Sequence, residues 1–172
     1  MHQEVASIIK LLEIEDEIIA NLQEEVCGLT NSQEAKQITQ DLLIRVDLSQ
    51  SISCVEDKPF YFLLLANCYL VAKELDKAIR FASLAVDNSR VCDMCWLQAI
   101  AHWVRGLLYR ENKELFLWRL ELKNALRLIT EKSDDCNIRG DYKGYRLSEK
   151  ARKKIKEEYD HSTKQGKSHL HS

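Results

Sequence analysis

The stretch that decides the fold is residues 59–90, PFYFLLLANCYLVAKELDKAIRFASLAVDNSR. Two apolar runs stand on either side of a polar turn at residues 73–75. Pro59 falls in the first turn of the first run, where a helix tolerates proline because the missing N–H would have no partner there anyway. Small residues recur at helical spacing in the second run: Ala78, Ala82 and Ala85. The stretch therefore predicts two closely packed helices, over 59–72 and 76–86.

The whole chain is poor in residues that turn the backbone. Its 172 residues include 5 Gly and one Pro, and no Asn-Gly or Asp-Gly pair occurs. Because β-hairpins need such residues at their turns, the sequence predicts an all-α fold. Apolar periodicity predicts further helices over 3–27, 32–50, 91–110, 114–129 and 147–159. Residues 130–144 are predicted to form a loop, and the polar residues 161–172 a disordered tail.

Bulky residues repeat at a fixed offset. Phe62 and Tyr69 are followed 34 residues later by Trp96 and Trp103. This offset matches the period of tetratricopeptide helix pairs. Residues 59–90 resemble that family in the opening signature and in the turn that follows it: Phe62, Leu65, Ala66, Tyr69, then Leu75-Asp76-Lys77-Ala78. Residues 91–130 resemble it in part, because Ala125 follows Ala85 by 40 residues, which indicates about six inserted residues.

The resemblance implies an architecture and a general function. Members of the family stack antiparallel helix pairs into a right-handed superhelix, which implies about six helices here, followed by a basic C-terminal helix. The expected organisation is a helical domain over 1–132, then a loop and basic helix over 133–160. Within the domain we expect an atypical acidic hairpin (1–58), a clear repeat (59–90) and an extended repeat (91–132). The family implies a non-catalytic adaptor or chaperone-like scaffold that binds another protein.

In the family, the first helix of each pair lines a groove for a peptide or an amphipathic helix. Carried over by position, the partner-binding residues of this chain are Phe60, Leu63, Asn67, Leu70, Met94, Gln98, Ala101 and Arg105. Leu63 stands where members that bind a peptide carboxylate need a Lys, which argues against a receptor of that type. Two occupants suit such an apolar groove: a segment of a partner, or this chain's own C-terminal helix.

Charge is unevenly distributed along the chain. The net charge is −2, but residues 1–58 carry twelve acidic and four basic side chains, a net of −8. The stretch 143–156 is basic, with Lys143, Arg146, Lys150, Arg152, Lys153, Lys154 and Lys156 against one acid, Glu149. Contact with nucleic-acid phosphates, with Tyr142 and Tyr145 stacking on bases, is one interpretation. The other is a solvated helix that docks on the acidic first third.

The chain lacks a Gly-rich phosphate loop, a His-Glu-x-x-His motif and a Gly-x-Ser-x-Gly motif. We therefore predict that it is not an enzyme and uses no cofactor or metal. Cys92-Asp93-Met94-Cys95 is the single Cys-x-x-Cys, and a zinc site would need a second pair, so core packing is favoured over a thiol switch.

The sequence has no membrane-length apolar run and no signal-like start, which predicts a cytoplasmic protein. A homodimer remains an open alternative.

Overall fold

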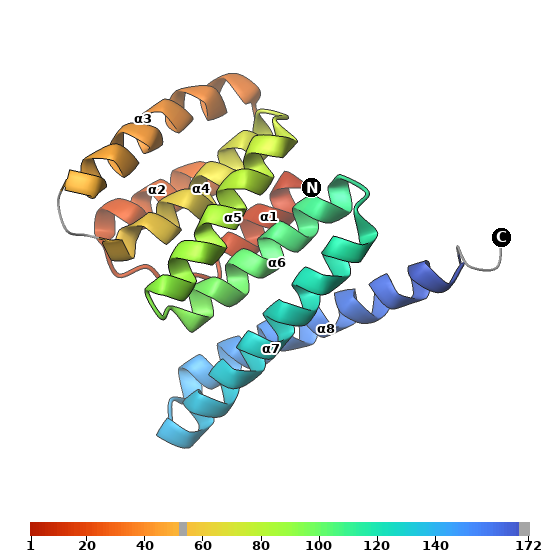
Figure 1. Ribbon diagram of the computed structural model, residues 1–172. Helices are drawn as coiled ribbons and strands as arrows, with labels where there is room; N and C mark the ends of the chain where they lie inside the picture. The colour runs from red at the N-terminus through yellow and green to blue at the C-terminus, as the bar shows by residue number, and fades with distance from the viewer. Residues whose placement is uncertain (52–54, 169–172) are drawn as a thin grey trace.

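The computed structural model describes residues 1–51 and 55–168, and these residues are helical throughout except at the turns and the α1–α2 loop (Figure 1). The elements are α1 (His2–Ile9), α2 (Glu17–Cys27), α3 (Ser32–Ser51), η1 (Val55–Asp57), α4 (Lys58–Val71), α5 (Leu75–Val91), α6 (Cys95–Glu111), α7 (Leu115–Arg139) and α8 (Tyr142–Ser168). Here η1 is a single 3-10 turn. The predicted all-α class is confirmed.

The single helix predicted over 3–27 is wrong, because the chain breaks between α1 and α2. Asp16 is the reason: its carboxylate accepts a hydrogen bond from the Ile19 N–H at 3.0 Å and caps a new helix. The amide of Gln23 then donates to two carbonyls at and after the end of α1, those of Ile9 (2.8 Å) and Leu12 (3.2 Å). Apolar periodicity alone cannot detect such a break, since both helices keep the same apolar spacing.

Three helices run further than predicted. α5 passes through residues 87–89, α7 passes through most of the predicted loop at 130–144, and α8 continues to Ser168. Polar side chains inside these helices bond back to their own backbone, as Asn88 does to the Leu84 carbonyl at 2.8 Å and Thr130 to Leu126 at 2.8 Å. The predicted tail is therefore helical over 161–168, and its remaining residues, 169–172, lie outside the described part of the chain.

Three successive turns, α4–α5, α5–α6 and α6–α7, share one backbone geometry. Each contains one residue with a positive φ: Lys73 (63°), Asp93 (54°) and Lys113 (62°). In the first turn the Glu74 N–H bonds to the Tyr69 carbonyl at 2.8 Å, and equivalent bonds close the other two, as in a Schellman motif. The turns recur every 20 residues, so the α4–α5 and α6–α7 hairpins are offset by 40. The 34-residue offset from Phe62 to Trp96 therefore does not join equivalent positions.

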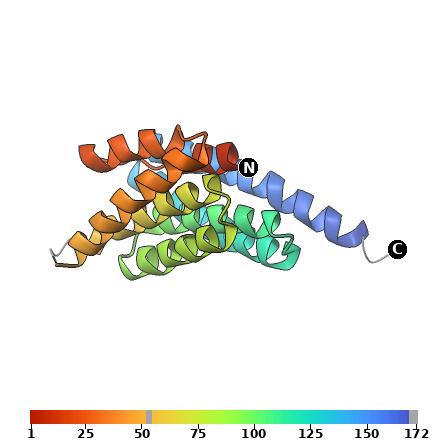
Figure 2. The same cartoon turned by 90° about the horizontal axis from the view of Figure 1, so that it is seen from above.

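Helices α4 to α8 pack one on the next, and α1 and α2 form a separate layer on one side of them (Figure 2). α1 packs against both α4 and α6, and α2 packs against α4. This makes α4 the central helix, and all eight residues from 61 to 68 are buried. The α7–α8 corner, closed by Gly140 with a φ of 73°, extends beyond the other helices (Figure 1).

Candidate partner-binding cleft

The predicted partner-binding residues do not form one surface. Leu63 and Asn67 are both buried on α4, the helix against which α1 and α2 pack. Asn67 is 1% exposed, and its side-chain amide donates to the Val26 carbonyl near the end of α2, at 3.1 Å. Leu70, further along α4, is half-buried. At α4, the groove implied by the family resemblance is therefore covered by the N-terminal helices of this chain rather than by its C-terminal helix.

Arg105 points away from that layer, into the space between α5 and α7. Its guanidinium donates to both carboxylate oxygens of Glu121, at 2.9 and 2.8 Å, and to the Ser83 hydroxyl at 3.3 Å. Because the guanidinium is held inside the fold, a charge reversal at Arg105 would disrupt packing and would not test partner binding. Gln98, two turns earlier on α6, is half-buried, and Ala101 is buried.

Glu121 belongs to an internal cluster that joins α6 to α7. Its carboxylate also lies 2.6 Å from His102 Nδ1. Burial by itself would raise the pKa of Glu121, but the hydrogen bonds from His102 and Arg105 outweigh it and hold the pKa below the ordinary value. Gly106 permits this close approach of the two helices, because a Cβ there would lie 3.1 Å from the Glu121 Cβ. The cluster is enclosed and serves the packing of the array.

A second carboxylate, Glu158 on α8, is held by two indoles. Trp103 Nε1 on α6 and Trp118 Nε1 on α7 each donate to it at 3.0 Å. Arg110 lies 3.6 Å from the carboxylate, and its other nitrogen pairs with Glu4 of α1 at 2.6 Å. Burial raises the pKa of Glu158, and the two indole hydrogen bonds and the Arg110 charge offset the rise only in part. These contacts tie α8 to α6 and α7, and α1 to α6.

Phe60 and Met94 are the two predicted residues that the structure brings together at the surface. Both line two adjoining hollows, of about 470 and about 350 Å³, and Glu13 also borders both. We name the combined depression the Phe60–Met94 cleft. Its walls are the α1–α2 loop, the start of α4, the α5–α6 turn and the C-terminal half of α7. The larger hollow adds Leu12, Trp96 and Leu97, and the smaller one Ile14 and Ile19.

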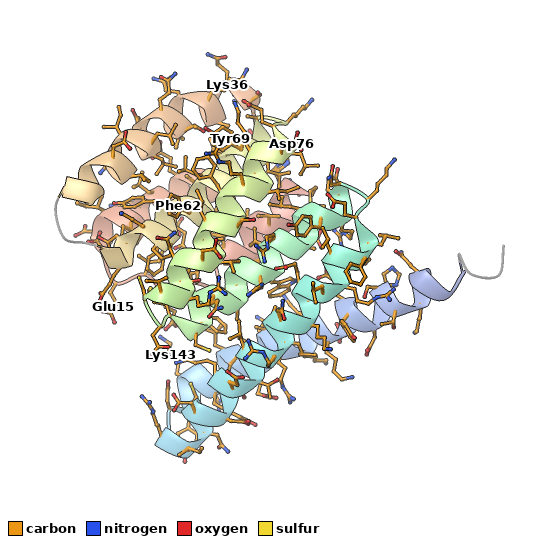
Figure 3. All side chains as sticks on the ribbon, in the orientation of Figure 1. Glu15, Lys36, Phe62, Tyr69, Asp76 and Lys143 are labelled. Atoms are coloured by element: carbon orange, nitrogen blue, oxygen red, sulfur yellow. The ribbon has the colours of Figure 1, made fainter. Side chains whose placement is uncertain are left out.

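The rim of the cleft is acidic. The two hollows are lined by eight carboxylates: Glu13, Glu15, Asp16, Glu56, Asp57, Asp93, Glu131 and Asp135. Two cations line the same walls, Lys132 and Arg139. Arg139 pairs with Asp135 at 2.9 Å, and Lys143 from the start of α8 reaches Glu13 at 3.0 Å. Figure 3 labels Lys143 and also Glu15, which stands on the α1–α2 loop at this side of the molecule.

Burial and like charge act together at the smaller hollow. Burial raises the pKa of Asp57, and the neighbouring carboxylates of Asp16 and Glu56 raise it further. No basic residue lines this hollow among the residues that the structure describes. The Phe60–Met94 cleft thus has a charge-poor apolar middle and a carboxylate-rich end next to the start of α2.

Several cleft residues were missed at the sequence level. Trp96 was noted only for its 34-residue offset from Phe62 and not as a binding residue, yet it is half-buried and lines the cleft. Glu131 and Asp135 fell in the predicted loop. Their spacing with Arg139, four residues each time, is the signal that was available, because it puts all three on one face of a helix.

The basic stretch 143–156 lies on α8 and packs through Ala151 and Ile155, both buried. Three of its cations are paired: Lys143 with Glu13, Arg152 with Glu149 at 2.7 Å, and Lys156 with Asp160 at 3.4 Å. Within the described part of the chain, the other four have no ion-pair partner: Arg146, Lys150, Lys153 and Lys154. Tyr142 is 77% exposed, whereas Tyr145 is half-buried. Among the described residues, the predicted docking on the acidic first third is thus limited to the Lys143–Glu13 ion pair, and Lys154 lines a hollow that Glu4 and Ser7 also line.

Three of the described thiols, those of Cys27, Cys68 and Cys95, are part of the core or pack against it. Burial raises the pKa of Cys27 to about 11 and that of Cys68 to about 12. Burial also raises the pKa of Cys95, whose sulfur donates to the Leu128 carbonyl at 3.5 Å. Since the thiolate is the reactive form, a raised pKa makes Cys95 a slow nucleophile at neutral pH.

Comparisons with protein-family models, curated proteins and solved structures gave no match for this chain. Of the helices in the described ranges, none is long and apolar enough to cross a membrane. Over the same ranges, no three His, Cys, Asp or Glu side chains gather as a metal-binding group. The site must therefore be interpreted from its own geometry.

Proposed function

We propose that this chain is a non-catalytic protein-interaction module of the helical-repeat type, an adaptor or scaffold of the cytoplasm. It binds a segment of a partner protein in the Phe60–Met94 cleft. The observation that supports this most is the cleft itself: half-buried Phe60 and Met94 border both of its hollows, of about 470 and 350 Å³, and half-buried Trp96 borders the larger one. Hollows of this size that combine apolar area with a few polar groups are typical of binding sites.

Two further features support a binding role over a catalytic one. The buried carboxylate of Glu121 and the partly buried carboxylate of Glu158 both join helices, and both lie outside the cleft. The cleft is lined by acids, by the cations Lys132 and Arg139 and by apolar side chains. Among the described residues its one thiol, Cys95, donates to the Leu128 carbonyl and not to a base. The resemblance of residues 59–90 to tetratricopeptide repeats points the same way.

The test is capture of partners from the native cell with tagged protein, read by mass spectrometry. A Met94→Lys variant puts a charge into the apolar middle of the cleft and is expected to lose the captured proteins. The matched control is Phe116→Lys, because Phe116 is 75% exposed on α7 and does not line the cleft. Both variants must keep the helical circular dichroism of the original protein. If Met94→Lys captures the same proteins as the original chain, the cleft is not the binding site.

A second function, association with nucleic acid, is supported by one observation. The cations of α8 without an ion-pair partner follow the helix at spacings of three and four, with exposed Tyr142 one turn before the first of them. Such a stripe suits phosphates on one strand, with an aromatic side chain for stacking.

Salt-dependent retention on single-stranded DNA or RNA tests this second function. Reversal of three stripe cations is expected to abolish retention: Arg146→Glu, Lys150→Glu and Lys153→Glu. A control with the same charge change on exposed residues of other helices should retain it: Lys36→Glu, Arg80→Glu and Lys123→Glu. Each phosphate contact contributes about −0.9 or −0.7 to the slope of log affinity against log salt. A protein that is not retained at low salt has no such function.

A further inference from the structure

We infer that the Phe60–Met94 cleft selects a cationic amphipathic segment of its partner: apolar side chains enter the middle of the cleft, and Lys or Arg side chains meet the carboxylates beside the start of α2. This inference rests on the proposed function and adds to it the chemical class of the partner. It is carried by the distribution of apolar and charged groups along the cleft.

The middle of the cleft provides apolar contact area. Phe60 from α4, Met94 from the α5–α6 turn and Trp96 from α6 converge there from three elements, and all three are half-buried. Buried Leu97 adds to the same wall. Aromatic and Met side chains are the residues that contribute most to protein–protein contacts, because they bury a large area and adapt to different shapes.

The end of the cleft near α2 provides charge. Five carboxylates line the smaller hollow: Glu13, Glu15, Asp16, Glu56 and Asp57. Lys143 neutralises one of them, Glu13, and the Asp16 carboxylate caps α2. Among the described residues, Glu15, Glu56 and Asp57 have no basic partner. The carboxylates of Asp16 and Glu56 lie close enough to Asp57 to add to the effect of burial on its pKa, so a cation placed there gains attraction from several charges at once.

The opposite end is electrically balanced, which gives the partner a direction. Asp135 pairs with Arg139, and Glu131 pairs with Arg127 at 2.7 Å. A segment with Lys or Arg at one end and apolar residues next to them is therefore better matched than one with charge throughout. An anionic segment or a nucleic acid would meet like charge at the α2 end and is disfavoured.

A second copy of this chain is the competing occupant. The exposed α7–α8 corner carries Ile138 (84% exposed) and Tyr142 beside Arg139 and Lys143, so it has apolar and cationic groups of its own. Its two nearest cations are already paired within the chain, with Asp135 and Glu13. A separate partner is for this reason the better match.

The experiment measures fluorescence anisotropy of three short labelled peptides with the full chain. The first has Leu and Phe at helical spacing with Lys at one end, the second is identical except for Glu in place of Lys, and the third is a scramble of the first. The first peptide is expected to bind at least about tenfold more tightly than the second, and more weakly at high salt. It is also expected to bind more tightly than the scramble, because only it presents one apolar face.

Charge-neutralising variants locate the effect. Glu56→Gln combined with Asp57→Asn is expected to weaken binding of the cationic peptide by about threefold to tenfold, since two rim charges are lost. The control with the same charge change, Asp76→Asn with Glu111→Gln, involves exposed residues outside the cleft and should leave binding unchanged. Met94→Lys should abolish binding of the peptide altogether.

The outcomes separate this inference from the proposed function. If the cationic and anionic peptides bind equally and Met94→Lys abolishes both, the cleft is a binding site but the charge inference is wrong. If no peptide binds at millimolar concentration, the inference is overturned, while partner capture by the original chain and not by Met94→Lys still upholds the proposed function. If light scattering finds a dimer that Met94→Lys dissociates, the occupant is a second copy and the inference is also overturned.

Discussion

Glu121 on α7 and Glu158 on α8 are two carboxylates that join neighbouring helices, Glu121 through α6 and Glu158 through both α6 and α7. Glu121 meets an arginine and a histidine, with side-chain exposure of 5%. Glu158 meets two neutral indoles, with Arg110 further away, and is 15% exposed. The pKa is lowered at Glu121 and raised at Glu158.

This difference shows that burial alone does not decide in which direction the pKa of a carboxyl group shifts. Burial raises the pKa at both sites. The hydrogen bond with His102 and the charged guanidinium of Arg105 more than compensate Glu121 for lost solvation, whereas the neutral indoles at Glu158 do not. Glu121 therefore acts as a permanent ion-pair partner between α6 and α7, and Glu158 as a hydrogen-bond acceptor that anchors α8.

The largest expected effect is that of Glu121→Gln. This substitution leaves the Arg105 guanidinium buried without a counter-charge, which we expect to lower the free energy of unfolding by about 3 kcal/mol. Urea unfolding followed by circular dichroism measures it. Removing the cation too, in Arg105→Met with Glu121→Gln, should cost less than the sum of the two single substitutions, because no buried charge is left unpaired. A loss below about 1 kcal/mol for Glu121→Gln would contradict the ion-pair role.

The pH dependence of stability should have opposite signs at the two sites. Because the folded pKa of Glu121 is lowered, its contribution is present above the ordinary value and is lost as pH falls through the folded pKa. Because the folded pKa of Glu158 is raised, its contribution is present below the ordinary value and is lost as pH rises through the folded pKa. Each group changes the free energy of unfolding by at most about 1.4 kcal/mol per pH unit.

Urea unfolding from acid to neutral pH measures both effects. The difference in the free energy of unfolding between the original protein and Glu121→Gln should shrink towards acid pH. The free energy of unfolding of the original protein minus that of Glu158→Gln should instead fall as pH rises above the ordinary pKa of a glutamate. If the two variants gave parallel pH profiles, the pKa values of the two carboxylates would be shifted in the same direction, which would contradict this prediction.

A smaller effect is expected for Glu158→Gln at neutral pH. The amide oxygen of Gln can still accept a hydrogen bond from Trp103 or Trp118, and Gln avoids the cost of burying a charge. We expect a loss of about 1 kcal/mol or less in the free energy of unfolding. A loss equal to that of Glu121→Gln would mean that Arg110, and not the indoles, dominates at Glu158.

The smallest effect, a gain, is expected for Lys113→Gly in the turn between α6 and α7. Lys113 has a φ of 62°, a conformation that glycine adopts without strain. The substitution should raise the free energy of unfolding by about 0.5–1 kcal/mol. Because the turn touches neither carboxylate, the gain should be the same in the original protein, in Glu121→Gln and in Glu158→Gln. Unequal gains would show that the turn and one of the carboxylates are coupled.

How much of the fold was predictable depends on which interactions define it. The helices at 59–72 and 91–110 were predicted to within a few residues, because apolar spacing and a proline or a polar turn mark their ends. The break before α2 was missed, since it depends on one carboxylate at Asp16 and on the distant Gln23. The continuation of α7 was missed because polar side chains such as that of Thr130 can donate hydrogen bonds to backbone carbonyls of their own helix.

The candidate site was predictable only in part for the same reason. Phe60 and Met94 were predicted to bind a partner, and they do line one cleft. Asn67 and Arg105 were predicted with them, but Asn67 faces α2 and Arg105 faces Glu121. Their positions on the helices say which residues share a face, but not which neighbouring helix covers that face.

By itself, the sequence determined the helical class, the helix-turn spacing around residues 73–75, and the charge imbalance between the acidic first third and the basic stretch at 143–156. These are local properties, set by backbone preferences and by residues close in the chain. Only the tertiary structure decided that α1 and α2 cover α4, that the carboxylates of Glu121 and Glu158 have opposite pKa shifts, and that Phe60 and Met94 share a cleft. Such outcomes depend on contacts between residues far apart in sequence, and burial and Coulomb energies are fixed only when those contacts form.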